Sequence, residues 1–389
     1  MILSWLVLAA ASVVLFLSLW IVVPAWNYPL LMLAVGGTEY SPWLCLCSVL
    51  ICVLARGRSR PSRAAFAIAG CAALISSIPL ARAPFALRRF DLEMARALGD
   101  GFLNDVATTS LERMRPRPIV VSELFRPIEW GDATVVRGIP VASPKGQPLT
   151  ATIHRPRSQG RFPAIVQIHG GSWQHGDASE QDWFARYFAA RGYVVFSIEY
   201  RLAPRWQWPA QIDDVRNAFD WIRRHADDYQ ADMSRLAVVG RSAGAHLAML
   251  AAFGPQPQAV RAVVSFYGPV DLAGGYREPP SPDPMGVRAL EEAFLGGTPD
   301  SVPANYRDAS PISYVGARQP PTLIINGGRD HVIAPRWGRL LHDRQLANGT
   351  TSALLEIPWA EHSFDSVENG PSAQIALYYT ERFLAWALR

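Results

Sequence analysis

The first fifth of the chain carries long apolar runs that few charges interrupt. Residues 2–23 and 64–81 contain no charged residue, and a transmembrane helix needs about 20 consecutive apolar residues to cross the hydrocarbon core. Residues 30–55 form a further apolar stretch, but Glu39 and several helix-breaking residues interrupt its first half. We therefore expect two or three membrane-spanning helices within residues 1–81. Residues 30–55 form either a third crossing with an irregular start or a re-entrant or interfacial hairpin.

The placement of arginines predicts the orientation of these helices. The connection at residues 24–43 has no basic residue, whereas residues 56–63 contain four arginines. Because basic loops stay in the cytoplasm, we expect the amino terminus there too. Three crossings then place the rest of the chain on the extracytoplasmic side of the cell membrane. Three arginines shortly after residue 81 favour the opposite orientation. A cleaved signal peptide is the alternative for residues 2–23, but that segment lacks a basic start and further apolar segments follow it.

An amphipathic helix is expected at residues 84–115. Its apolar side chains recur at three- and four-residue spacing, with arginines between them, as one buried helix face requires. Such a helix can lie on the membrane surface or fold over the mouth of an enzyme as a lid. We treat residues 82–118 as an amphipathic linker or lid that joins the membrane region to the rest of the chain.

Short apolar runs alternate with helical periodicity through residues 119–389. Strands are expected at residues 134–142, 149–154, 163–168, 193–198, 236–239, 260–266, 322–326 and 353–357. Helices are expected at residues 183–188, 212–222, 243–253, 335–347 and 372–388. The strands are apolar on both faces, which is typical of a mostly parallel sheet covered by helices on each side. Residues 271–321 are rich in proline and glycine and are a candidate wall over the site.

Composition and charge exclude several classes of function. Of the 389 residues, 50% are hydrophobic, enough for a large core, so the chain is not disordered. Most of the 37 basic and 33 acidic residues lie after residue 81 in nearly equal numbers, so nothing there is built to bind a nucleic acid. All four cysteines precede residue 82, so residues 82–389 hold neither a disulfide framework nor a thiolate zinc site. We expect no metal and no cofactor, and the sequence does not reveal the oligomeric state.

A candidate nucleophile lies between a predicted strand and a predicted helix. Gly240-Arg241-Ser242-Ala243-Gly244 matches the G-x-S-x-G pattern, follows the strand at residues 236–239 and opens the helix at residues 243–253. A strand–turn–helix elbow needs small neighbours around a strained serine. It places the hydroxyl at a helix amino terminus, where backbone N–H groups point outward. The alternative is an ordinary tight turn.

The serine needs a base and the base needs an orienting acid, in the chain order serine, acid, histidine. His362 follows the last predicted strand, and Asp330 follows the strand before it. We therefore predict Ser242, Asp330 and His362 as a catalytic triad. The other histidines after the serine are His246, His331 and His342. The rival acids are Asp308 and Asp365.

The oxyanion of the transition state needs fixed N–H donors. Gly170 and Gly171 follow the strand at residues 163–168, and glycines let the backbone approach a substrate. We assign the donors to the amides of Gly170, Gly171 and Ala243. Trp173 is a candidate for lining the acyl pocket, whereas His169 is expected to hold the loop by hydrogen bonding.

These motifs together resemble the α/β-hydrolase superfamily, in particular the hormone-sensitive-lipase-like esterases. The matching segments run from about residue 163 to residue 389 and include Tyr200-Arg201-Leu202-Ala203-Pro204. The resemblance implies an α/β-hydrolase fold after a helical transmembrane region, with the same three triad residues. The chain departs from the pattern at Arg241, where many members carry an acid. The elbow and the segment from His169 to Trp173 are more similar to the formamidase and prenylcysteine-methylesterase branches.

The leading functional hypothesis is a membrane-anchored serine hydrolase that cleaves a small-molecule or lipid ester through an acyl-enzyme. An amidase or formamidase, a peptidase, or an acyltransferase could use the same triad. A catalytically silent membrane receptor or scaffold is a hypothesis from another class. Transport through the first helices is a further one, with Glu39 as the only charged residue inside a candidate span. Acyl length and leaving group are not readable from the sequence.

Overall fold

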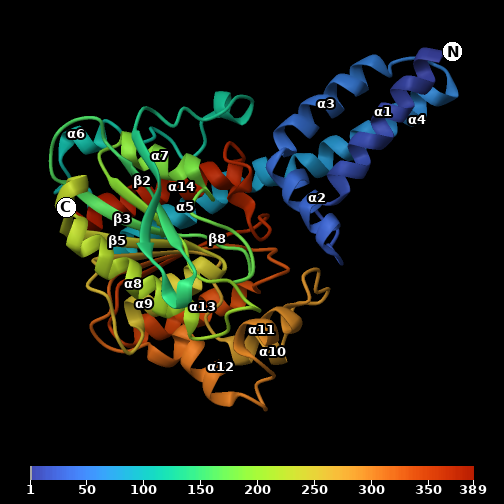
Figure 1. The fold of residues 1–389 in the computed structure, drawn as a ribbon. Helices are drawn as coiled ribbons and strands as arrows, with labels where there is room; N and C mark the ends of the chain where they lie inside the picture. The colour runs from blue at the N-terminus through green and yellow to red at the C-terminus, as the bar shows by residue number, and fades with distance from the viewer. Residues whose placement is uncertain (1) are drawn as a thin grey trace.

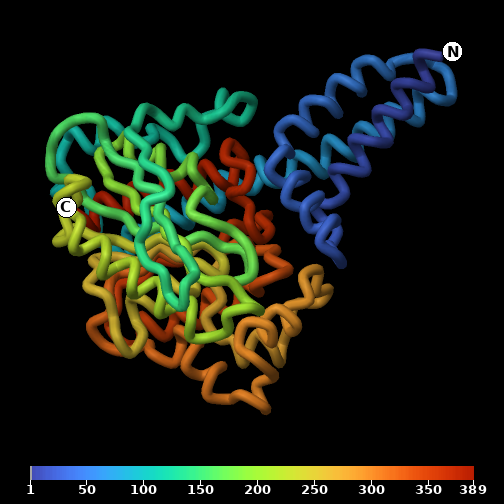
Figure 2. Tube along the Cα trace, in the orientation of Figure 1, coloured from blue at the N-terminus to red at the C-terminus, as the bar shows by residue number. Residues whose placement is uncertain are grey.

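The computed structural model describes residues 2–389, which form an apolar helical arm and an α/β body. The arm projects from one side of the body, with the amino terminus near its far tip (Figure 1, and as a trace in Figure 2). The two parts meet at the base of the arm, beside helix α2 (Tyr28–Glu39). The arm ends at residue 76, where α4 ends.

Three helices form the shaft of the arm: α1 (Ile2–Leu19), α3 (Ser41–Leu54) and α4 (Arg60–Ser76). Helix α4 packs along both of the others. Two helical stretches, residues 2–19 and 60–98, are long and apolar enough to cross a membrane. A third is possible if α2 and α3, which are bent by 73° relative to each other, count as one broken span. The expected irregular start of residues 30–55 corresponds to this bend.

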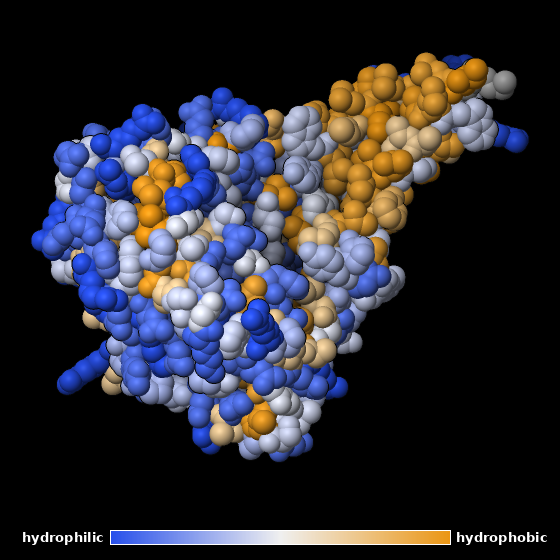
Figure 3. Space-filling view, viewed as in Figure 1, coloured by the Kyte–Doolittle hydropathy of each residue, from blue (hydrophilic) through white to orange (hydrophobic). Residues whose placement is uncertain are grey.

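The surface of the arm is mostly apolar, with polar patches at its tip and towards its base (Figure 3). Large apolar side chains on every helix of the shaft are exposed, including Leu3, Val13, Leu54 and Leu74. Water-soluble domains rarely expose a continuous apolar surface of this kind. That these helices cross a membrane stays a prediction.

The amphipathic segment forms helix α5 (Ile78–Leu98), which packs against strand β8 (Ser352–Ile357). Its apolar face, with Phe90 and Met94, is buried in the body. The lid interpretation of residues 82–118 is therefore wrong, because this helix packs against the sheet. Its placement on the membrane surface stays a prediction, since Phe85 and Leu92 on its outer face are exposed. The helix also ends at Leu98 rather than near residue 115, since Gly99 takes a φ of 92° that a regular helix cannot continue.

The body is built on one sheet of eight strands with the order β1-β2-β4-β3-β5-β6-β7-β8. The strands from β4 to β8 in this order run parallel, whereas β2 is antiparallel to both of its neighbours. The strand bounds are β1 (Thr134–Ala142), β2 (Leu149–Arg155), β3 (Phe162–Ile168), β4 (Val194–Ile198), β5 (Ala231–Arg241), β6 (Ala262–Phe266), β7 (Thr322–Gly327) and β8 (Ser352–Ile357). The predicted α/β-hydrolase fold with a mostly parallel sheet is confirmed.

Helices cover both faces of the sheet and enclose two cores. One core packs against α8 (Ala210–His225), α9 (Ala243–Phe253) and α13 (Pro335–Ala347). The other packs against α5, α7 (Asp182–Ala190) and α14 (Pro371–Ala387). Buried strand residues alternate between the cores; Val238 belongs to one and Val239 to the other, as the two-residue period of a strand requires.

The proline- and glycine-rich stretch at residues 271–321 folds into three short helices and connecting loops at one end of the sheet (Figure 1). They are α10 (Leu272–Arg277), α11 (Val287–Leu295) and α12 (Pro303–Ala309). Met285 and Val287 from this stretch border the cavities beside Ser242, so it supplies part of the expected wall.

Candidate active site

Ser242 occupies a sharp turn between β5 and α9. Its backbone φ is 51° and its ψ is −121°, a conformation that is strained for any residue with a side chain. The two glycines around it permit the turn: a Cβ on Gly240 would lie 2.2 Å from the Gly244 oxygen, and one on Gly244 would lie 2.2 Å from the Ile168 oxygen. The small residues of the motif therefore let strand, turn and helix pack at this distance, with the serine hydroxyl at the start of the helix.

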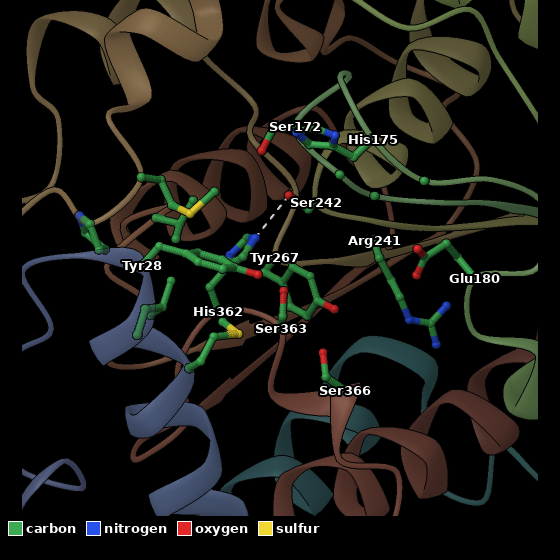
Figure 4. Close-up of a pocket in the computed structure, with 18 of the residues that line it drawn as sticks. Tyr28, Ser172, His175, Glu180, Arg241, Ser242, Tyr267, His362, Ser363 and Ser366 are labelled. Atoms are coloured by element: carbon green, nitrogen blue, oxygen red, sulfur yellow. Dashed lines mark hydrogen bonds between the residues drawn. The ribbon is translucent and has the colours of Figure 1, made fainter.

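Three side chains from three separate loops form one hydrogen-bonded chain. The His362 Nε2 lies 3.0 Å from the Ser242 Oγ, and its Nδ1 lies 2.8 Å from Asp330 Oδ2 (Figure 4). Asp330 Oδ1 accepts the amides of Val332 and Ile333 at 2.8 and 2.7 Å. Both carboxylate oxygens are thus engaged, which holds the tautomer with a proton on Nδ1 and leaves Nε2 able to accept the serine proton.

The rival residues from the sequence are placed elsewhere. His246 is buried in α9, accepts the indole N–H of Trp173 at 3.2 Å and lies 2.6 Å from the Ala309 oxygen; burial lowers its pKa to about 4. His331 pairs with Glu361 at 2.8 Å. The remaining rivals contact neither Ser242 nor His362 through a hydrogen bond: they are His342, Asp308 and Asp365.

The three amides predicted as oxyanion donors lie around the serine. The Gly170 and Gly171 backbones border the cavity in front of Ser242, and Ala243 is the first residue of α9. Within the part of the chain that the structure describes, none of these three amides donates to a backbone oxygen in the loops and turns. His169 holds the loop, as its ring stacks on Tyr200 at 4.3 Å between centroids and its Nδ1 lies 2.8 Å from the Gly170 oxygen.

Two cavities meet at Ser242. The larger has a volume of about 610 Å³ and is also bordered by His362, Gly170 and Gly171. The smaller has a volume of about 20 Å³ and is bordered by Ala243 and by Trp173, the predicted lining residue of the acyl pocket. Among residues 2–389 no cluster of three or more histidine, cysteine, aspartate or glutamate side chains is placed to hold a metal ion.

The arm contributes residues to the larger cavity that are not predictable from the sequence. Tyr28, Leu31 and Met32 of α2 border it, and Figure 4 shows Tyr28 beside His362. They lie more than 200 positions before Ser242, inside a stretch whose apolar composition indicates only burial or lipid contact. No local signal in the sequence connects them to the elbow.

Arg241, the residue that departs from the family pattern, belongs to a buried network under the histidine. Its Nε donates to Asp365 at 2.5 Å, and its guanidinium lies over Phe184 at 4.4 Å from the ring centroid. The Tyr267 hydroxyl donates to the other oxygen of Asp365, and the Tyr267 ring lies 4.6 Å from that of His362. Burial and the neighbouring Asp365 carboxylate raise the pKa of Tyr267 well above its usual value, so the phenol stays protonated and keeps donating.

Replacing Arg241 with methionine is expected to destabilise the body by roughly 3–5 kcal/mol, because Asp365 is left as an uncompensated buried carboxylate. Thermal unfolding of the detergent-solubilised protein measures this effect. The double variant Arg241→Met/Asp365→Asn removes the stranded charge and should recover part of the loss. If Asp365→Asn lowers stability in the Arg241→Met background as much as it does in the unaltered protein, loss of the ion pair is not the cause of the destabilisation.

Glu291 of α11 borders the smaller cavity and is only 3% exposed. Burial raises its pKa to about 9, with the charges of Asp271 and Asp283 adding to the effect. The carboxyl is therefore neutral at pH 7. Its Oε2 has no hydrogen-bond partner among the residues the structure describes.

The stability of the protein should consequently depend on Glu291 at neutral and alkaline pH. Below pH 4.5, the ordinary pKa, the Glu291 carboxyl is protonated in both the folded and the unfolded protein, so it does not lower the free energy of unfolding. As the pH rises towards the folded pKa of about 9, the unfolded state ionises first and stability falls. Glu291→Gln, a neutral isostere, should raise the melting temperature at pH 8 and leave it unchanged near pH 4.5. Parallel pH profiles for the two proteins would contradict this expectation.

The chain is similar in sequence to known esterases. The BD-FAE family model matches residues 152–345. Esterase LipC of Mycobacterium tuberculosis is 37% identical over 238 residues, which cover 56% of this chain and 58% of LipC. The probable carboxylic ester hydrolase LipM of the same organism is 27% identical over 405 residues, 95% of this chain and 87% of LipM. The chain thus spans little more than half of LipC but most of LipM.

Solved structures show the same fold. The thermophilic esterase Est2 of Thermogutta terrifontis superposes with a TM-score of 0.55 and 25% identity, covering 66% of this chain and 93% of that one. An esterase of Pyrobaculum calidifontis gives a TM-score of 0.57 at 24% identity, covering 72% of this chain and 98% of its own. The second likeness concerns the fold alone.

Proposed function

The chain belongs to the hormone-sensitive-lipase-like esterases of the α/β-hydrolase superfamily, and from this premise we propose that it is a membrane-anchored serine hydrolase that cleaves carboxylic esters. The observation that carries the proposal is the hydrogen-bonded chain from Ser242 through His362 to Asp330. The uncommitted amides of Gly170, Gly171 and Ala243 beside the hydroxyl support it.

The residues act in a definite order. His362 Nε2 takes the proton of Ser242 as the hydroxyl oxygen attacks the ester carbonyl, and the three amides stabilise the oxyanion. Nε2 then gives this proton to the departing alcohol, which leaves an acyl-enzyme. Nε2 then takes a proton from a water molecule as the water oxygen attacks the acyl carbonyl, and it returns this proton to the Ser242 Oγ as the acid leaves. Throughout, Asp330 accepts the hydrogen bond from the His362 Nδ1–H and balances the charge on the imidazolium.

Hydrolysis of matched substrates by the full-length protein in detergent tests the proposal. We expect p-nitrophenyl acetate to be cleaved far faster than p-nitroacetanilide, and a fluorophosphonate probe to label the protein covalently. Faster cleavage of the anilide, or of peptides, would make the protein an amidase or peptidase. Absence of labelling, with no cleavage of either compound, would favour the silent receptor.

Membrane anchoring is the second part of the proposal. At about 1.5 Å per residue, α1 with its 18 residues is about 27 Å long, close to the hydrocarbon thickness of a bilayer. Arg56 and Arg58 lie in the turn between α3 and α4, and Arg60 and Arg63 lie in the first turn of α4. This turn is at the tip of the arm, and the body lies at the other end (Figure 1). We therefore propose a cytoplasmic tip and an extracytoplasmic body.

Cysteine labelling tests this orientation, because all four native cysteines lie in the arm. In a variant whose native cysteines are replaced by alanine, Arg157→Cys on the body should react with a membrane-impermeant maleimide in intact cells. The matched control, Arg58→Cys at the tip, should react only after the cells are permeabilised. The reverse pattern would place the body in the cytoplasm, and equal labelling of both in intact cells would exclude a crossing arm.

A further inference from the structure

The two cavities at Ser242 receive different halves of an ester. The Nε2 atom of His362 must reach the oxygen of the leaving alcohol to protonate it. His362 borders the larger cavity. Among residues 2–389, those that border the smaller cavity include Ala243 and Trp173 but not His362. If the protein is the esterase proposed above, the alcohol half lies in the larger cavity and the acyl half in the smaller.

The smaller cavity limits the acyl group to a short one. Its volume of about 20 Å³ is close to that of one water-sized group. Trp173 forms a fixed wall, because its ring stacks on Phe294 at 4.3 Å between centroids with an interplanar angle of 2° and its N–H donates to His246. Leu290 of α11 closes another side. An acetyl group fits such a space, and a long acyl chain does not.

The larger cavity has one apolar side and one polar side. Tyr28, Leu31 and Met32 of α2 face the cavity together with Met285 and Val332. Polar side chains also border it, namely His175, Glu180, Gln181, Arg241 and Ser366. Figure 4 shows Tyr28 on one side of His362, with Arg241 and Glu180 on the other. An alcohol with a hydrocarbon chain on α2 and a polar group near the opposite wall suits this arrangement.

Helix α2 is held against the catalytic loops. The guanidinium of Arg329, the residue before Asp330, donates to the carbonyls of Trp20 and Val23 at 3.4 and 3.2 Å and also to that of Ile21. Trp20 and Leu31 pack in one cluster with Val287 and Val332. The base of the arm is therefore part of the wall of the site.

The position of α2 also indicates where the alcohol comes from. The shaft of the arm exposes apolar side chains along its length, and α2 lies where the shaft meets the body (Figures 1 and 3). In a membrane-anchored protein this junction lies at the bilayer surface, where amphiphilic molecules accumulate.

We propose that α2 of the arm binds the hydrocarbon chain of a lipophilic alcohol, so that the substrate is a short-acyl ester, such as an acetate, of an amphiphilic membrane alcohol. This inference rests on the proposed esterase function. It assigns Met32 and its neighbours as specificity-determining residues of the alcohol side. It assigns Leu290 to the acyl side.

Two isomeric esters test the assignment in the unaltered full-length protein. Octyl acetate and ethyl octanoate have the same composition, but the long chain lies in the alcohol of the first and in the acyl group of the second. Acid release in detergent micelles should show kcat/KM at least about tenfold higher for octyl acetate, because one misplaced methylene in an apolar pocket already changes rates about tenfold. Equal rates, or preference for ethyl octanoate, would overturn the proposal.

Single substitutions test which cavity binds the alcohol and which binds the acyl group. Met32→Trp, which fills the α2 side, should lower kcat/KM for octyl acetate about tenfold while ethyl acetate changes less than about twofold. Leu50→Trp, an equally apolar substitution on the exposed surface of α3, is the matched control and should change neither. Leu290→Ala should raise the rate on ethyl butyrate relative to ethyl acetate by about fivefold. Equal loss on both acetates in Met32→Trp would exclude the alcohol site on α2.

Failure of this inference can be told apart from failure of the proposed function. A protein that binds a fluorophosphonate at Ser242 and prefers ethyl octanoate is still an esterase, with the two cavities exchanged in role. A protein that is not labelled and cleaves neither isomer is not an esterase.

Discussion

Ester hydrolysis by Ser242→Ala is expected to be slower than that of the unaltered protein by about 10⁴- to 10⁶-fold in kcat, because removal of a triad nucleophile abolishes the acyl-enzyme route. The Oγ is the only atom lost, and it lies 3.0 Å from the His362 Nε2. The remaining rate would come from the oxyanion amides and from substrate positioning. Single-turnover and steady-state measurements on p-nitrophenyl acetate, with equal amounts of folded protein, measure the effect.

The backbone at this position makes the choice of control important. Ser242 holds a φ of 51°, and alanine has the same Cβ, so the strain of the turn is not relieved and the fold should be kept. Ser172, which borders both cavities but has no bond to the histidine, is the matched control. Ser172→Ala should stay within about tenfold of the unaltered rate. A Ser242→Ala protein that is folded and retains most of its activity would refute the mechanism.

Asp330→Asn should lower kcat by about 10⁴-fold, the loss expected when a triad acid can no longer hold the correct tautomer. Asp330 Oδ1 accepts two backbone amides, from Val332 and Ile333. The asparagine oxygen would keep those two bonds, so its NH₂ group would face His362. An amide donor there favours a ring with its proton on Nε2, and such a ring cannot accept the proton of Ser242.

Asp308, the rival acid from the sequence, is the control for this variant. It is exposed and pairs with Arg307 at 3.0 Å, so Asp308→Asn should change kcat by less than twofold, as expected of a surface substitution. A large loss in Asp308→Asn, with little change in Asp330→Asn, would mean that the acid of the triad has been misassigned.

Much of the fold follows from patterns that act over short distances. The apolar strands of the sheet are recognisable because each is buried on both faces, and the bounds of β1 agree with the expected residues 134–142. The triad of Ser242, Asp330 and His362 could be predicted from the sequence for a related reason. Each lies just after the end of a parallel strand, and the ends of neighbouring parallel strands meet at one edge of a sheet.

The contribution of the arm to the wall of the active site could not be predicted in this way. Leu31 and Val332 pack together although they are separated by 300 positions, and nothing in either local sequence names the other as its partner. The same limit explains the error over α5. The spacing of Phe90 and Met94 indicates that one helix face is buried, but it does not say whether a lipid surface, a cavity mouth or strand β8 covers that face.

Arg241 illustrates a third limit. Arg241 departs from the pattern that the resemblance implies, and its role is not readable from the sequence. The structure pairs it with Asp365, whose position in the sequence predicts only a loop. The charge reversal is explained by a partner 124 residues away.

The attachment of Arg329 to the base of the arm affects how the enzyme should be prepared. A soluble fragment that begins after the arm would lose the wall formed by α2, and the guanidinium next to the catalytic acid would lose its three carbonyl acceptors. Truncation would thus both open the site to bulk solvent and loosen the loop of Asp330. If α2 binds lipophilic alcohols as proposed, screens run on such fragments would underestimate turnover of lipophilic substrates.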